Sequence, residues 1–132
     1  MIKIQNVKLS LDAVSDLIST ALEGGSNYWY QIVGHDKPAS ITFRSSLFKD
    51  DEKPHPYYDF PLNEGGAVHF EADGAGEDNQ VFTLNLESIH KGLNLLLDKY
   101  PSRLAAIVDE SYDAEDADVF LQASLFGEVV FG

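Results

Sequence analysis

Carboxylates and histidines are the side chains of this sequence with the most obvious chemical potential, since the chain has 22 Asp and Glu residues and no cysteine. The histidines never stand two or four residues apart, which is the spacing that presents two imidazoles to one metal ion. They are His35, His55, His69 and His90. The acidic runs "DGAGED" and "DESYDAEDAD" offer oxygen ligands, but neither has the residue order of a calcium-binding loop. We therefore predict no metal site and no cofactor.

Catalytic motifs are missing from the sequence as well. It contains no "GxSxG" nucleophile elbow, no "HExxH" zinc signature and no glycine-rich phosphate loop that ends in lysine and serine. The many carboxylates would allow any pair to be chosen as glycosidase residues, so no particular pair is favoured. We predict that the protein is not an enzyme and assign no catalytic residue.

The charge balance is strongly acidic, with a formal net charge of −13. Such a charge repels nucleic acids and anionic membranes, and it attracts basic protein surfaces. We therefore predict no direct nucleic-acid or membrane partner and a protein partner with a basic surface; the alternative is that the charge serves solubility alone. The predicted protein-binding carboxylates are Glu71, Asp73, Glu77, Asp78, Asp109, Glu110, Asp113, Glu115, Asp116 and Asp118.

An aromatic stretch, "EGGSNYWYQI", follows the first amphipathic helical pattern. The simplest interpretation is a left-handed helix stop at Gly24 or Gly25, followed by a strand whose aromatics divide between the core and an exposed face. In the alternative interpretation, the segment binds a nucleotide by stacking and hydrogen bonding, with Asn27, Trp29, Tyr30 and Arg44 as the ligand-binding residues. A second aromatic cluster, "HPYYDF", is typical of an interface, including one between copies of the chain.

The pattern of elements predicts an α+β fold in a single domain that spans residues 1–132. We expect strands over "IKIQNVKL", "NYWYQIV", "SITFRSSLF" and "EVVF", and a hairpin formed by "AVHFEA" and "VFTLN" around the loop "DGAGEDNQ". Helices are expected after Ser10, after Asn85, from Pro101 and over "VFLQASLFG", with Gly127 as a stop. The result is an antiparallel sheet of about four or five strands with about three to four helices packed on one side.

The location predicted from the sequence is the cytoplasm. An absence of cysteine suits a reducing compartment, and no run approaches the roughly 18 apolar residues of a membrane span. The N-terminal segment "MIKIQNVKLS" also lacks the apolar core of a signal peptide.

Three blocks of the chain resemble a family of small bacteriophage and prophage proteins: "ALEGGSNYWY", "LNLESIHKGLNLLLDKYP" and "DADVFLQASLFGEVVFG". The resemblance implies a phage protein in the host cytoplasm, and it carries no catalytic residue over. Our hypothesis is a stoichiometric antagonist of host antiviral defence that binds a basic, nucleic-acid-handling protein, as an anti-CRISPR protein does. The alternatives are a sponge that sequesters a signalling nucleotide and an oligomerising structural accessory protein.

Overall fold

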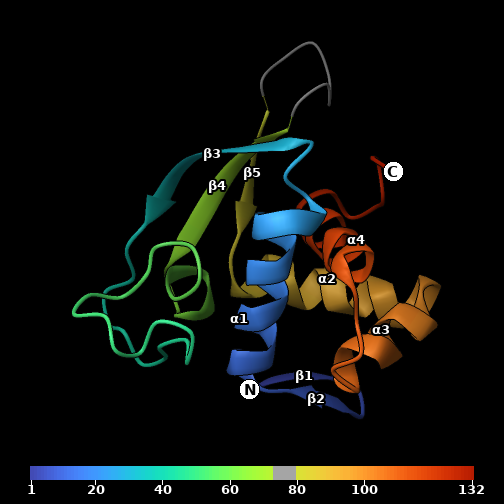
Figure 1. Ribbon diagram of the computed structural model, residues 1–132, viewed down its shortest axis with the longest axis horizontal. Helices are drawn as coiled ribbons and strands as arrows, with labels where there is room; N and C mark the ends of the chain where they lie inside the picture. Colours follow the sequence, from blue (N-terminus) through green and yellow to red (C-terminus); the bar gives the residue numbers. More distant parts are fainter. Residues whose placement is uncertain (73–79) are drawn as a thin grey trace.

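The computed structural model describes residues 1–72 and 80–132, and it confirms the α+β class (Figure 1). The described strands are β1 (Ile2–Ile4), β2 (Val7–Leu9), β3 (Tyr30–Asp36), β4 (Ala67–Ala72) and β5 (Val81–Leu84). The helices are α1 (Leu11–Thr20), α2 (Leu86–Lys99), α3 (Pro101–Val108) and α4 (Ala114–Phe126), with a π-helical turn at Ala21–Gly25 and a 3₁₀ turn at Phe60–Leu62. None of these helices is both long enough and apolar enough to cross a membrane.

The strands of the described residues form two antiparallel sheets. One has three strands in the order β3-β4-β5, and the other is the small β1-β2 hairpin. The predicted β4-β5 hairpin is confirmed, while its predicted loop lies outside the described residues. The N-terminal segment turns back on itself at Gln5, which has a φ of 51°, so it forms a hairpin instead of one strand.

Two predicted strands are absent from the described structure, and in both cases a side chain binds the backbone groups that a neighbouring strand would bind. Asn63 Oδ1 accepts from the backbone N–H groups of Thr42 and Phe43, within "SITFRSSLF". Gln122 Oε1 accepts from the N–H groups of Val130 and Phe131, within the C-terminal "EVVF". The main sheet therefore has fewer strands than predicted.

The helix ends follow the local sequence. Ser10 caps α1, Asn85 and Asp113 form capping boxes with the residues three positions later, and Gly127 ends α4 with a φ of 72°. The predicted left-handed stop at Gly24 or Gly25 is wrong, because α1 continues into the π-helical turn. Gly25 is needed there for a different reason: a Cβ at this position would collide with the carbonyl group of Ala114 in α4.

The core lies between the main sheet and the helices, which Figure 1 shows on one side of that sheet. Its largest fully buried side chains are Trp29, Phe70 and Phe120. Helices α2 and α4 approach closely at Gly92, where a Cβ would meet Ser124. Residues 37–66, called the long loop below, have little regular structure, and their Tyr58 and Leu62 side chains pack into this core.

Candidate functional site

The predicted protein-binding carboxylates do not form one surface. Exposed members are Asp109, Glu110, Asp113 and Glu115; Glu71 and Asp116 are half-buried. Asp118 is buried, with 6% of its surface exposed. Asp73, Glu77 and Asp78 lie outside the described residues.

The assignment of Asp118 to an exposed binding surface is wrong. One of its oxygens accepts hydrogen bonds from Ser26 Oγ at 2.8 Å and Trp29 Nε1 at 2.7 Å, and the other accepts from Tyr28 Oη at 2.7 Å. Burial and this bond to Asp118 raise the pKa of Tyr28 to about 12. Asp118 lies in the first turns of α4, on the helix face that packs against the residues after the π-helical turn, so it joins two distant parts of the chain.

Other residues of the acidic run stabilise the start of α4. Arg103 Nη1 lies 2.7 Å from Asp116 Oδ1 and its Nη2 lies 3.0 Å from Glu115 Oε1, and these bonds raise the pKa of Arg103. The hydrogen bond from the backbone N–H of Asp116 holds the pKa of the Asp113 carboxyl below its ordinary value. These carboxylates are therefore already engaged within the chain.

Three carboxylates, those of Asp16, Glu110 and Asp113, line a groove of about 430 Å³ between α1 and the α3–α4 connection. This acidic groove is lined by Ala13, Asp16, Thr20, Ile107, Glu110, Tyr112, Asp113 and Ala114. Among the described residues, no lysine, arginine or histidine forms an ion pair with Asp16 or Glu110. Burial, followed by the charges of Asp12 and Glu110, raises the pKa of Asp16. The groove thus concentrates negative charge that the chain itself does not balance, and it suits a cationic group.

The residues predicted to bind a nucleotide do not converge. Trp29 is 1% exposed and stacks on Phe131, with ring centroids 5.4 Å apart, so the prediction that it stacks on a ligand is wrong. Tyr30 is half-buried and donates its hydroxyl hydrogen bond to the carbonyl of Leu22. Asn27 is exposed, and Arg44 lies in the long loop.

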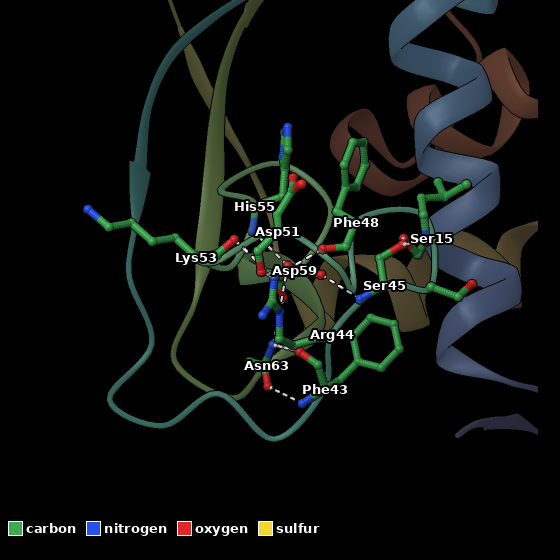
Figure 2. A network of polar contacts seen from close by, with 12 residues as sticks. Ser15, Phe43, Arg44, Ser45, Phe48, Asp51, Lys53, His55, Asp59 and Asn63 are labelled. Atoms are coloured by element: carbon green, nitrogen blue, oxygen red, sulfur yellow. Dashed lines mark hydrogen bonds and ion pairs between the residues drawn. The ribbon is translucent and has the colours of Figure 1, made fainter.

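Arg44 belongs instead to a polar network that organises the long loop, shown in Figure 2. Its Nη2 donates to the backbone carbonyls of Phe48, Asp51 and Lys53 at 2.9–3.1 Å. Its Nε lies 3.8 Å from Asp59, which is fully buried. The guanidinium therefore binds backbone carbonyls of the long loop and is not available to bind a nucleotide phosphate.

Asp59 is the centre of this network, and the sequence analysis did not single it out. Its two oxygens accept from the backbone N–H groups of Ser45 and His55, both at 2.6 Å. The buried amide of Asn63 extends the network by donating to the backbone carbonyls of Phe43 and Asp59. The only sequence signal was a pair of turn-forming side chains, Asp and Asn, four residues apart around Pro61.

The network is joined to α1 by two further hydrogen bonds. The hydroxyls of Ser15 and Ser45, both fully buried, lie 2.7 Å apart, and the Ser46 N–H donates to Asp12 at 2.9 Å. The long loop is thereby fixed against the helix that forms one wall of the acidic groove.

We also looked for clusters of metal ligands and for similar proteins. Within the described residues, no group of three or more histidine, aspartate or glutamate side chains is placed to hold a metal ion. Comparisons of the chain with protein-family models, curated proteins and solved structures find no match.

Proposed function

We propose that this chain is a non-enzymatic binding protein whose acidic groove docks stoichiometrically on a basic surface of a partner protein. The observation that carries the proposal is the unbalanced charge at Asp16 and Glu110 on the two sides of one groove. In the phage setting that the resemblance implies, the partner is a host defence protein that handles nucleic acid, and binding antagonises it.

Electrostatics supports a cationic partner at this groove. Asp16 is partly desolvated and repelled by its acidic neighbours, so a lysine or arginine from a partner would relieve that repulsion on binding. The net charge of −13 would also accelerate encounters with a basic protein at low salt. Binding should therefore weaken as salt rises, because screening shortens the reach of these charges.

The nucleotide sponge and the oligomeric accessory protein remain alternatives with less support. A sponge needs aromatic faces open to a base, whereas Trp29 is covered by Phe131. An oligomer needs a self-complementary surface, and a groove dominated by one sign of charge repels a second copy of itself.

The first experiment is capture of partners from a bacterial host by the tagged protein, with elution by increasing salt and mass spectrometry of proteins and small molecules. Any captured protein is then purified and titrated by calorimetry. We expect a 1:1 complex with a basic protein that salt dissociates. A retained nucleotide without a protein partner would favour the sponge instead.

Two triple variants test the position of the contact. The groove variant is D16N/E110Q/D113N, in which the third change preserves the helix cap because asparagine caps as well as aspartate. The control variant, D50N/E52Q/E128Q, removes the same number of charges from exposed residues outside the groove. We expect the groove variant to bind at least about tenfold more weakly and the control to change much less. Equal losses in both would show that only the total charge matters and would overturn the groove as the contact.

A further inference from the structure

The two aromatic stretches of the sequence, "EGGSNYWYQI" and "HPYYDF", meet in the folded chain. Tyr58 of the second stretch donates its hydroxyl to Glu23 of the first at 3.4 Å. Tyr30 from β3 is close enough to Tyr57 and Glu23 for their charges to raise its pKa, after the larger effect of its own burial. The aromatic–carboxylate surface consists of the exposed Glu23 and the half-buried Tyr30, Phe48, His55 and Tyr57, and it adjoins the buried ring of Tyr58, which is 5% exposed.

Three of these rings pack against one another, and two of them are parallel. Phe48 and Tyr58 stack with centroids 5.2 Å apart and planes 4° apart, and His55 lies 4.5 Å from both at angles of 30° and 27°. Tyr57 stands at 85° to Tyr58, with a centroid distance of 6.4 Å. Tyr57 also stands edge-on to His55, at 69° and 5.4 Å. The rings therefore form a cluster in mutual contact, which differs from a cage that surrounds a ligand on several sides.

The carboxylate of this surface is free to pair with a cation. Glu23 is exposed on the π-helical turn, and among the described residues no basic group forms an ion pair with it. Burial, followed by the charge of Glu23, raises the pKa of Tyr58 to about 12. Single π-helical turns of this kind are frequent at functional sites.

The network of Figure 2 holds these rings in place. Asp59 accepts from the backbone N–H of His55, and Arg44 donates to the backbone carbonyl of Phe48. His55 Nδ1 in turn accepts from the N–H of Tyr57 at 3.1 Å. The rings are thus positioned before any ligand arrives, which lowers the entropic cost of binding.

We propose that the aromatic–carboxylate surface binds an arginine side chain of a protein partner, with the guanidinium against Tyr57 and His55 and paired with Glu23. A planar guanidinium can stack on an aromatic face and pair with a carboxylate at its edge. A lysine ammonium, a compact and strongly hydrated charge, gains less from contact with an aromatic face. This arginine site is separate from the acidic groove. It rests on the proposed function only in that the arginine site and the groove would each bind a basic partner.

The test is an NMR titration of the full chain with the peptide acetyl-Gly-Arg-Gly-amide, and with its lysine counterpart, at fixed ionic strength. We expect saturable shifts of the ring signals of Tyr57 and His55 with the arginine peptide, and weaker binding of the lysine peptide. Absence of saturable shifts, or the same shifts with sodium chloride alone, would overturn the proposal.

Single variants separate this site from the acidic groove. E23Q and Y57L should each weaken arginine-peptide binding by about three- to tenfold, because they remove the ion pair and the stacking face. E64Q, which neutralises another exposed carboxylate, and E110Q, which alters the groove, should leave it within about twofold. An equal effect of E110Q would place the peptide in the groove and overturn this site while supporting the proposed function. If D16N/E110Q/D113N loses its captured partner but still binds the arginine peptide as the wild type does, the two sites are independent and the arginine site is supported.

Discussion

Two buried aspartates stabilise different parts of this molecule by different means. Asp59 is fully buried and receives two backbone N–H groups, with the Arg44 guanidinium nearby. Asp118 receives only side-chain donors, from Ser26, Tyr28 and Trp29, and no cation accompanies it in the described structure.

The sequence separation of the donors also differs. The backbone donors of Asp59 are 14 and 4 residues away, whereas the donors of Asp118 are 89 to 92 residues away. Asp59 therefore replaces the hydrogen bonds that regular structure would give to a long loop, while Asp118 joins the last helix to the segment after the first. The comparison teaches that a buried carboxylate can organise a loop locally or connect the ends of a chain.

The largest effect is expected from D59A. This change leaves two backbone N–H groups and the Arg44 charge without their acceptor, so we expect a loss of about 3 kcal/mol in the free energy of unfolding. Urea unfolding measures it, and hydrogen exchange should quicken mainly within residues 37–66. E52Q, at an exposed position in the same loop, is the control. A loss below about 1 kcal/mol would show that the loop does not depend on Asp59.

Removal of the other carboxylate, by D118A, should lower the free energy of unfolding by about 2 kcal/mol, somewhat less than D59A. The change leaves three neutral donors unpaired, but it leaves no cation without its partner. Hydrogen exchange should quicken in residues 26–30 and in α4. The pKa of Tyr28 should fall from about 12 but stay above its ordinary value, because burial, the largest cause of the elevation, remains; the ultraviolet absorbance of tyrosinate measures it. Y28F lacks the titrating hydroxyl and so identifies the Tyr28 signal in the titration. It should lower the free energy of unfolding less than D118A does, since it removes only one hydrogen bond. An unchanged tyrosine titration would contradict the role of Asp118.

A glycine pair probes the close contact beside Asp118. In G25A the new Cβ would collide with the Ala114 carbonyl group, so we expect a loss of about 1 to 2 kcal/mol in thermal or urea unfolding. The matched control is G24A, whose Cβ would meet nothing within 4 Å. G24A should be neutral or slightly stabilising, because alanine favours helix. Equal losses in both variants would show that the contact with α4 is not what requires glycine.

The smallest effect is a pH dependence in the long loop. Burial lowers the pKa of His55 from its ordinary value of 6.5, against the opposing charges of Asp59 and Asp51. As pH falls below about 6.5, the imidazole of the unfolded chain binds a proton before the folded imidazole does. Protonation therefore favours the unfolded chain, and the free energy of unfolding decreases as pH falls.

H55N is the variant for this measurement, since its amide oxygen can accept from the Tyr57 N–H but does not titrate. Between pH 7 and pH 5 the unfolding free energy of the wild type should fall more steeply than that of H55N. A steeper fall in H55N would reverse the sign and contradict a lowered pKa.

Local signals predicted the helices and the β4–β5 hairpin well. Ser10, Asn85 and Gly127 act at helix ends through contacts within a few residues, as predicted from the neighbouring sequence. The start of α4 was placed too late, over "VFLQASLFG", because Asp113, the residue that caps this helix, was assigned to the acidic binding surface. The missing strands could not be predicted in this way. Their backbone groups are bound by Asn63 and Gln122, and alternation of apolar residues carries no information about such partners.

The candidate sites also combine features that the sequence determines with features that depend on distant residues. The sequence alone determined the net charge, the absence of cysteine and the two aromatic stretches, because these depend only on composition and order. Only the tertiary structure decided which carboxylates remain exposed, since burial of Asp118 and pairing of Asp116 depend on residues far along the chain or on another helix. It also brought Glu23 to Tyr58 across 35 positions, a proximity that no local pattern encodes.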